Sequence, residues 1–473
     1  MRNSKRVRYS PLWVIILVIC WGTVLSVRCG GQVSPRPNVL LIYTDDQGQW
    51  GAGIYDNTEI HTPNIDRIFQ EGVTFRRAFV PTPVCSPARA TLLTSRYSIQ
   101  HGVEDYINPR ETELGIRDDY LLLPELLQEH GYTTGLVGKW HLGTTPLYHP
   151  TKHGFDYFMG FVEGGTRPVD PMLEINGNKQ QCTGPLPDLL TDASLAFIRD
   201  NAETPFYLSV HYRAPHMPYG PVPDQDRDWY LDLDPTIPRY PDLDEAKVRT
   251  WTRDYYASIS SVDRNINRLL ATLDSLDLSD NTIVIFTSDH GYNIGHHGIH
   301  TKGNGWWALK EMEGPKHRRP NMWDTSLSIP LGIRWPSHIA PASEIREMVT
   351  SLDFYPTILD MLDITPPPDL TFEGQSIVPL LTSTERNVPW RDAVFGCYDM
   401  HHGAVAHMRY IRTRDWKYIR HYEQGAEDEL FDLQKDPGET RNLIDNPKSR
   451  IVLAGLQIRL LEWQRSVSDS FAQ

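Results

Sequence analysis

The stretch Asn38-Val39-Leu40-Leu41-Ile42-Tyr43-Thr44 is a continuous apolar run that leads directly into Asp45-Asp46-Gln47-Gly48. A strand with one solvated face would alternate apolar and polar residues, and this run does not. Continuous runs of this kind are typical of strands that are buried on both faces, as in a parallel sheet covered by helices. The stretch therefore favours an α/β fold, and it places two carboxylates just past the end of a strand.

Three further apolar runs repeat this pattern, and each precedes charged or imidazole side chains. Residues 134–137 precede Lys139 and His141, residues 206–212 precede His216, and residues 282–287 precede Asp289 and His290. Helix-like segments lie between the runs, at residues 65–71, 122–130 and 254–276. Alternating strands and helices predict a mainly parallel central sheet flanked by helices. Ligands bind at the carboxyl ends of such strands, so we expect these side chains to converge on one site.

The remaining chain predicts a smaller C-terminal part. Residues 301–319 are polar and rich in Trp and Lys, which is typical of a long loop over the site. Four short strand-like segments follow in close succession and predict an antiparallel sheet, and a final helix completes an α+β subdomain. These elements are expected at residues 393–398, 408–413, 416–421, 428–433 and 451–464.

The N-terminus is typical of an export signal, because four basic residues precede the apolar run at residues 12–25. The run is short for a membrane span, so a cleaved signal is favoured over an anchor, with a secreted or periplasmic product. We therefore divide the chain into a signal and linker (1–35), a catalytic domain (36–385) and a C-terminal subdomain (386–473).

Composition excludes some classes of function. The 473 residues carry a formal net charge of −14, which argues against a nucleic-acid-binding protein. Of five cysteines, Cys20 and Cys29 lie in the leader, so no disulfide framework is implied. The sequence does not decide whether Cys182 and Cys397 form a disulfide bridge.

The stretch Val84-Cys85-Ser86-Pro87-Ala88-Arg89 predicts the start of a helix, with Ser86 as N-cap and Pro87 at the first helical position. Cys85 would then lie where unpaired N–H groups and the helix dipole favour negative charge. The helix start thus offers a sulfur nucleophile, or a group made from it, in an anion-binding setting.

Asp45, Asp46 and Asp289 would repel one another if they converged without a cation. A hard divalent cation relieves this repulsion, and calcium is the usual choice for a carboxylate-rich site.

Two segments carry a family resemblance. Residues 84–94 and 131–141 closely resemble the two signatures of the formylglycine-dependent (type I) sulfatases of the alkaline phosphatase superfamily, with Ser95 where the family usually has Gly. The resemblance implies that Cys85 is oxidised to formylglycine by a maturation enzyme and that Arg89 is its partner. It further implies that Lys139 and His141 hydrogen-bond the formylglycine hydrate, and that His216 and Lys302 bind sulfate.

The same resemblance implies a metal site. Asp45, Asp46, Asp289 and His290 would hold calcium together with the formylglycine derived from Cys85. Many family members have Asn where this chain has His290. Nitrogen is an uncommon calcium ligand, so magnesium and manganese stay open as alternatives.

The implied reaction is hydrolysis of a sulfate monoester through a sulfated-enzyme intermediate, and the chain looks closest to bacterial exported sulfatases that act on polysaccharides. A sulfated carbohydrate is then the expected partner, and neither nucleic acid nor a stable membrane span is expected. Basic and aromatic residues that could contact the sugar are His153, Arg167, Trp306, Trp307, His317, Arg318, Arg319, His401 and His402.

Other interpretations remain at this point. His290 also resembles phosphonate and phosphodiester hydrolases of the same superfamily. If Cys85 were never oxidised, the chain could be a non-catalytic protein that binds sulfated glycans. The histidines at 296, 297 and 300 could suggest zinc, although packing within a loop is the favoured interpretation.

Overall fold

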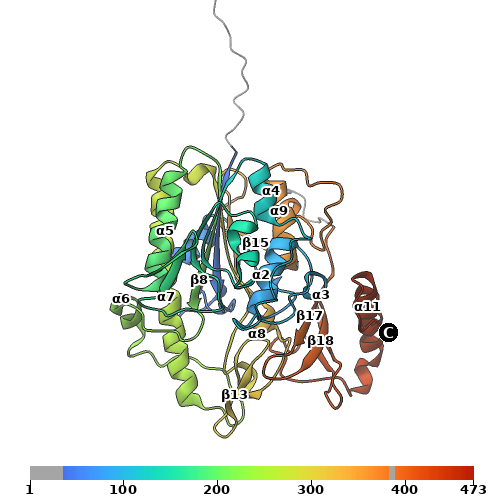
Figure 1. Ribbon diagram of the computed structural model, residues 1–473. Coiled ribbons are helices and arrows are strands. Elements are labelled where there is room, and N and C mark those ends of the chain that lie inside the picture. The colour runs from blue at the N-terminus through green and yellow to red at the C-terminus, as the bar shows by residue number, and fades with distance from the viewer. Residues whose placement is uncertain (1–35, 383–388, 473) are drawn as a thin grey trace, which may run out of the picture. The chain divides into compact units, whose positions relative to one another are not determined.

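The first apolar run forms strand β1 (Asn38–Asp45), in which every residue is buried. The computed structural model describes residues 36–382 and 389–472, and β1 lies in the middle of a ten-stranded sheet (Figure 1). The predicted export signal falls outside the described residues. Within the described residues, no helix has both the length and the apolar character needed to span a membrane.

The four predicted strands stand side by side. In the order β9 (Thr282–Ser288), β1, β8 (Phe206–Pro215) and β4 (Thr133–Lys139), every neighbouring pair is parallel. Their carboxyl ends therefore meet at one edge, as the sequence predicted. The sheet is extended by β5 (Tyr157–Phe161), β6 (Met172–Ile175) and β7 (Asn178–Gln181) on one side, and by β14 (Leu331–Arg334), β2 (Val73–Phe75) and β15 (Ser343–Ile345) on the other.

Helices cover both faces of this sheet (Figure 1). Leu40 and Ile42 of β1 belong to one hydrophobic core and Leu41 and Tyr43 to another, because successive side chains of a strand point to opposite faces. One core takes side chains from α1 (Pro63–Gln70), α5 (Leu186–Asp200) and α7 (Glu245–Ser275), and the other takes them from α2 (Cys85–Thr94), α4 (Leu123–Glu129) and α9 (Phe354–Met361).

Helix α7 begins earlier than predicted. The sequence predicted a start near residue 254, whereas α7 begins at Glu245, and the Asp244 side chain accepts a hydrogen bond from Lys247 N as its N-cap. The remaining short elements are α3 (Ser98–His101), α6 (Asp224–Arg227), α8 (Asp324–Leu327), α10 (Val378–Thr382), β3 (Ala78–Phe79) and β16 (Val349–Thr350).

The predicted C-terminal sheet is present and antiparallel. It runs β17 (Ala393–Met400), β18 (Ala406–Thr413), β19 (Trp416–His421) and β20 (Glu429–Asp432), and α11 (Arg450–Ser466) packs Leu456 and Leu460 into the same small core. Residues Arg36–Gln473 form one compact unit, and the boundary near residue 385 stays a prediction.

The prediction of a long loop at residues 301–319 was wrong. A four-stranded antiparallel sheet lies there, made of β10 (Asn293–Ile294), β11 (Ile299–Thr301), β12 (Trp306–Ala308) and β13 (Glu313–Arg318). Its strands have only two to six residues and carry many polar side chains, which hides the alternation expected of a strand.

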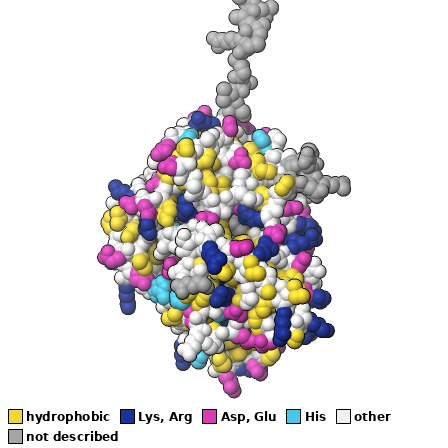
Figure 2. Space-filling model, turned by 90° about the vertical axis from the view of Figure 1, so that its right-hand side faces the viewer, with side chains coloured by type: hydrophobic (Ala, Val, Ile, Leu, Met, Phe, Trp, Pro, Cys, Tyr) yellow, Lys and Arg dark blue, Asp and Glu magenta, His cyan; other side chains and the backbone are white. Residues whose placement is uncertain are grey.

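Charge is mixed over the surface that Figure 2 shows. Acidic and basic side chains are interspersed there among hydrophobic ones, so the net charge of −14 does not form a single-sign field on that face.

Gly138 lets β4 lie close to β8. Its φ is +117°, and an added Cβ would lie 2.0 Å from the carbonyl oxygen of His211. We expect Gly138→Ala to lower the free energy of unfolding by about 2 kcal/mol or more, because β4 must move away from β8. Denaturant unfolding measures this change.

Gly455 of α11 is the matched control, since its added Cβ would meet no atom within 4 Å. Gly455→Ala should leave stability unchanged or raise it by about 0.5–1 kcal/mol. A Gly138→Ala variant as stable as the parent chain would contradict the close approach of β4 and β8.

Candidate active site

Cys85 is the first residue of α2, and all ten residues of this helix are buried. The residue before the helix is Val84, so the prediction of Ser86 as N-cap was wrong. Ser86 Oγ instead accepts a hydrogen bond from Ile107 N, at 3.0 Å, and holds a neighbouring loop against the helix. Cys85 thus lies closer to the positive end of the helix dipole than the sequence predicted.

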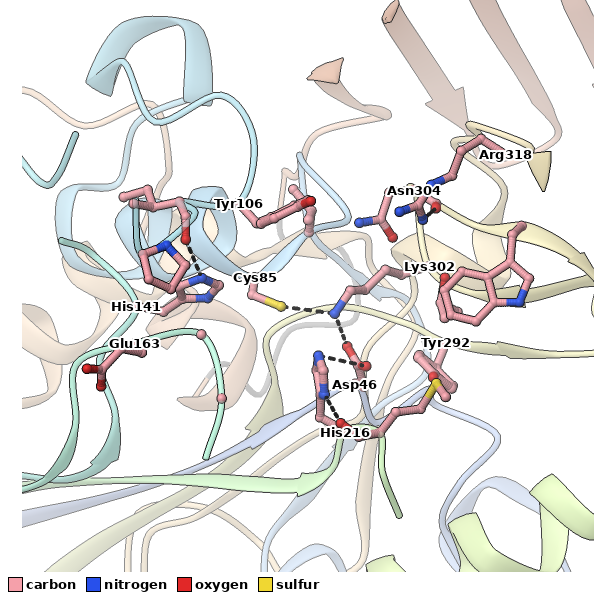
Figure 3. Close-up of a pocket in the computed structure, with 18 residues that line it drawn as sticks. Asp46, Cys85, Tyr106, His141, Glu163, His216, Tyr292, Lys302, Asn304 and Arg318 are labelled. Carbon is pink, nitrogen blue, oxygen red and sulfur yellow. Dashed lines mark hydrogen bonds and ion pairs between the residues drawn. The ribbon is translucent and has the colours of Figure 1, made fainter. Parts of the chain in front are cut away.

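The Cys85 sulfur lies among groups of both charges (Figure 3). Lys302 Nζ donates to Sγ at 2.9 Å, and Asp45 Oδ1 and His290 Nε2 lie 3.5 and 3.6 Å from it. Burial and the negative charge of Asp45 raise the pKa of the thiol, but the cations Lys139 and Lys302 outweigh them and the net pKa is lowered. The site therefore favours an anion at this position.

Three carboxylates surround the sulfur at the carboxyl ends of β1 and β9. Asp289 Oδ1 accepts a hydrogen bond from Asp46 N at 3.0 Å, which ties the two strand ends together. Ligand atoms of Asp45, Cys85, Asp289 and His290 all lie within 4.8 Å of one another. Four of the five predicted metal ligands thus lie at one point, and the fifth, Asp46, has its Oδ1 3.2 Å from His290 Nε2.

His290 is oriented for coordination. Its Nδ1 lies 2.9 Å from the Gly291 carbonyl oxygen, which can only accept, so Nδ1 carries the proton. Nε2 faces Asp46 Oδ1 and Asp289 Oδ1, at 3.2 and 3.3 Å. Burial lowers the pKa of this imidazole, but the negative charge of Asp289 outweighs burial, and the net pKa is raised. A backbone carbonyl that fixes the tautomer in this way is the usual support of a metal-binding histidine.

Buried cations balance the carboxylates. Lys139 Nζ lies 2.7 Å from Asp45 Oδ2, Arg89 Nη2 lies 2.9 Å from Asp289 Oδ2, and Lys302 Nζ contacts Asp46 Oδ1. Burial alone would raise the pKa of Asp45, but Lys139 and then His216 hold it well below its usual range. For Asp46 burial prevails over Lys302 and raises the pKa to about 7.

Arg89 lies behind the site, where only 1% of its surface is exposed. Its Nη1 donates to the Lys139 carbonyl oxygen at 3.0 Å, and its guanidinium lies over the Tyr43 ring at 5.3 Å. His211 Nδ1 lies 2.9 Å from the same carbonyl oxygen. Sequence reasoning missed His211, although an imidazole within the apolar run at 206–212 was a signal.

Two further histidines follow strands. His141 Nε2 donates to the Ile107 carbonyl oxygen at 3.1 Å, and its Nδ1 is buried without a hydrogen-bond partner in the described part of the chain. His216 Nε2 lies 3.7 Å from Asp46 Oδ2, and its side chain is 28% exposed. Burial is the main cause that lowers the pKa of both imidazoles well below the usual value.

These groups open into a pocket of about 380 Å³. Figure 3 shows His141 and Glu163 on one side of Cys85, and Asn304 and Arg318 on the other, and Tyr106 also lines the pocket. The Arg318 guanidinium lies 5.6 Å from the centre of the Trp306 ring, and Nη1 donates to the Asn304 carbonyl oxygen at 2.7 Å. Tyr106, Glu163 and Asn304 carried no sequence signal, because they lie on loops with no recognisable spacing.

The loop that carries Tyr106 is tied to the C-terminal sheet. Asp105 Oδ1 accepts from Tyr398 Oη at 2.9 Å, and Asp105 Oδ2 accepts from the backbone N–H groups of His401 and His402, each at 3.0 Å. His402 also packs against Tyr106, with ring centroids 4.4 Å apart and planes tilted by 33°. Two residues proposed from sequence for sugar contact therefore lie on the outer side of this loop.

The other predicted sugar contacts are dispersed. Trp306 and Arg318 line the pocket, whereas His153 is buried beside Trp140 and Arg167 is exposed outside the pocket lining. Trp307 and Arg319 line a second pocket, and His317 is half-buried on β13. Their contact with substrate stays a prediction.

Among the described residues, His296, His297 and His300 do not come together as one group of metal ligands. His296, His297 and His300 each pack on a different indole, those of Trp50, Trp323 and Trp251. Cys182 and Cys397 are free thiols in this structure, and Cys397 Sγ lies 3.2 Å from Ser98 Oγ.

Comparison with known proteins matches the sulfatase family to residues 37–364, and a second family, described as N-sulphoglucosamine sulphohydrolase, C-terminal, to residues 317–466. The N-acetylglucosamine-6-O-sulfatase of Bacteroides thetaiotaomicron is 28% identical over 99% of this chain and 92% of that protein. The ulvan-active sulfatase of Formosa agariphila is 27% identical over 99% of this chain and 89% of its own.

A solved structure is also similar. BT4656 in complex with its substrate D-glucosamine-2-N,6-O-disulfate matches with a TM-score of 0.81 at 25% identity, covering 92% of this chain and 99% of that chain.

The unmodified thiol of Cys85 should be unusually reactive. Because its pKa is lowered, it holds more thiolate at pH 7 than an ordinary cysteine, whereas burial raises the pKa of Cys397 to about 11. We expect iodoacetamide, with a chelator present, to alkylate Cys85 at least about tenfold faster than Cys397 at pH 7. Peptide mass spectrometry measures the two rates.

Lys302→Met should slow alkylation of Cys85 several-fold at pH 7, because the closest cation is lost. Lys316→Met, on an exposed part of β13, is the matched control and should have no effect. Equal rates in both variants would show that Lys302 does not set the thiol's reactivity.

Proposed function

Because this chain belongs to the sulfatase family, we propose that it removes sulfate from a sulfated carbohydrate with a formylglycine made from Cys85. Sulfate ester hydrolysis itself follows from the family. One observation above all supports the proposed nucleophile and the proposed metal site. The sulfur of Cys85, the first residue of α2, lies 2.9 Å from a buried lysine and within 4.8 Å of carboxylate and imidazole donors.

The position of Cys85 supports a modified side chain. Formylglycine supplies, as its hydrate, the hydroxyl oxygen that attacks sulfur. The Sγ atom occupies the place from which such an oxygen would reach both Lys302 and the carboxylates. The N-terminal end of α2 favours the negative charge that an acidified hydroxyl carries.

The donor set fits a hard divalent cation. Asp45, Asp46, Asp289 and His290 Nε2 offer three carboxylates and one oriented nitrogen, and the oxygen of the modified Cys85 would join them. Calcium is our first choice, with magnesium or manganese as alternatives because one donor is imidazole. A metal bound here supplies Lewis acidity to the attacking hydroxyl.

Other side chains of the site would position the carboxylates, bind the sulfate and transfer protons. Lys139 and Arg89 hold Asp45 and Asp289 in place from behind the site. Lys302 Nζ faces the pocket as a cation, where it would bind the sulfate oxygens and protonate the leaving alcohol, and His216 Nε2 lines the same pocket 3.7 Å from Asp46 Oδ2. His141 Nδ1 keeps its lone pair because Nε2 donates to the Ile107 carbonyl oxygen, so His141 would accept the proton of the remaining hydroxyl as sulfate leaves and the aldehyde re-forms.

A sugar is the substrate that best fits the pocket. Trp306 and Tyr106 offer ring faces, while Glu163, Asn304 and Arg318 offer hydrogen-bonding groups. The three relatives described above are named for N-acetylglucosamine, for ulvan and for a complex with a disulfated glucosamine, and all three compounds are carbohydrates. An exported protein would meet such polymers outside the cell, which agrees with the signal predicted at residues 1–35.

Mass spectrometry of the peptide spanning Cys85 tests the nucleophile. In a host that matures other sulfatases, we expect formylglycine at this position, and Cys85→Ala should lower turnover of 4-nitrophenyl sulfate by about 10³-fold or more. Cys182→Ala is the control and should retain activity. An unmodified, inactive Cys85 in such a host would favour the glycan-binding alternative instead.

Turnover assays also distinguish a sulfatase from the phosphodiester hydrolase considered as an alternative. A sulfatase should turn over 4-nitrophenyl sulfate faster than bis-4-nitrophenyl phosphate, and the reverse order would favour the alternative that His290 suggests.

Metal removal should lower thermal stability. Extended chelation leaves the carboxylates less well neutralised, and restoring calcium at about 100 times its Kd should add about 2.7 kcal/mol. Thermal unfolding with calcium, magnesium and manganese compares the three ions without reference to turnover. Asp46→Asn should abolish the metal-dependent shift, whereas Asp56→Asn, on the surface, should keep it. Stability that is insensitive to all three ions would exclude this metal site.

A further inference from the structure

A second pocket lies on the other side of the small sheet β10–β13. Its volume is about 540 Å³, and it is separate from the pocket that contains Cys85. Its lining comes from the loop at 238–241, the turn between β10 and β11, strand β12 and the C-terminal sheet. The side chains that matter below are Arg239, Tyr240, Trp307, Arg319, Trp323 and Glu429.

The hairpin of β12 and β13 forms a wall of both pockets. Trp306 lines the first pocket and Trp307 the second, because consecutive side chains of a strand point to opposite faces. Arg318 and Arg319 divide in the same way, and Arg319 N continues the pairing by donating to the Gly305 carbonyl oxygen at 2.7 Å. Each pocket therefore receives one tryptophan and one arginine from the same hairpin.

The second pocket presents aromatic faces. The rings of Tyr240 and Trp307 lie with centroids 6.3 Å apart and planes tilted by 38°, and Tyr240 is 37% exposed. Trp323 forms a deeper part of the lining, with His297 stacked on it at 4.0 Å and the Arg319 guanidinium 4.8 Å from its ring. Exposed aromatic rings beside polar groups suit the apolar face and hydroxyl edge of a pyranose.

The polar residues that line the second pocket carry charges of both signs. Glu429 accepts from Trp323 Nε1 at 2.9 Å and from Arg319 Nη2 at 3.4 Å, so its charge is balanced within the wall. Thr325 Oγ1 and His296 Nδ1 also line the pocket, and both are buried without a hydrogen-bond partner in the described residues. Such a lining offers hydrogen bonds to hydroxyl groups rather than a strong field for a sulfate.

Backbone contacts hold the loop that carries Tyr240 against the strand that carries Trp307. Leu243 forms a bridge with Leu309 just past β12, and Asp244 N donates to the Ala308 carbonyl oxygen at 3.0 Å. Lys310 N donates to the Asp242 carbonyl oxygen at 3.1 Å. The loop that carries Tyr240 is thereby attached to the strand that carries Trp307, and the site is preformed.

We propose that this second pocket binds a pyranose residue of the polysaccharide through its ring face and hydroxyl groups, and so retains the polymer near the active site. The choice of a sugar rests on the proposed function, whereas the site lies outside the catalytic residues. Retention raises the local concentration of sulfate esters without extending the catalytic pocket.

Affinity electrophoresis in native gels tests the proposal. The gels contain chondroitin sulfate, heparin or κ-carrageenan, and matched gels contain the desulfated form of each. We expect the parent chain to be retarded by at least one polymer, in both its sulfated and desulfated forms. Tyr240→Ala and Trp307→Ala should each weaken that retention at least about fivefold.

Trp229→Ala is the matched control, because Trp229 is 61% exposed and stacks on His61 outside this pocket. It should leave retention unchanged. Tyr240→Ala lies outside β12, so its effect cannot arise from displacement of Trp306. The proposal is overturned if no polymer retards the parent chain, if only sulfated polymers do, or if both pocket variants are retained as the parent is.

Turnover of 4-nitrophenyl sulfate by the same preparations separates this proposal from the proposed function. Both pocket variants should keep at least about half of the parent's turnover, because the small ester does not need the second pocket. A chain without sulfatase activity that still loses retention on Tyr240→Ala would disprove the proposed function and support the sugar site.

Discussion

Buried negative charge at the carboxyl edge of the sheet is the constraint on which the structure depends. Asp45, Asp46 and Asp289 lie together with at most 1% of their surface exposed, which is costly unless cations compensate. Arg89, Lys139 and Lys302 reach the same point from α2, from the end of β4 and from the turn after β11. Elements far apart in the chain are thus required at one place, and a divalent ion would complete the balance.

This arrangement explains which parts of the molecule were predictable from sequence. The four central strands are long apolar runs, and their parallel order follows from the helices between them, so the edge that collects Asp45, Lys139, His216 and Asp289 could be predicted. Asp45 and Lys139 are the last residues of their strands, and His216 and Asp289 are the first residues after theirs. Their convergence could be predicted from one rule, that parallel strands have their carboxyl ends at the same edge of the sheet.

Prediction failed where local pattern carries little information. The strands β10–β13 are too short and polar for alternation to show, so a sheet was taken for a loop. Ser86 has the chemistry of an N-cap, yet its hydroxyl accepts a hydrogen bond from Ile107 N of a neighbouring loop. Glu163 and Asn304 enter the pocket from loops whose course depends on tertiary packing, and His153 is a buried packing residue that resembles a ligand only in sequence.

The bonds that Asp105 makes to Tyr398, His401 and His402 have an evolutionary consequence. They make the C-terminal sheet a support of the loop that presents Tyr106 to the pocket. A recombination event that replaced the chain beyond residue 385 would change the contacts that support this loop, and with them the position of Tyr106 in the pocket. Substrate range and the C-terminal region should therefore be inherited as a unit, while the cluster around Cys85 can stay constant.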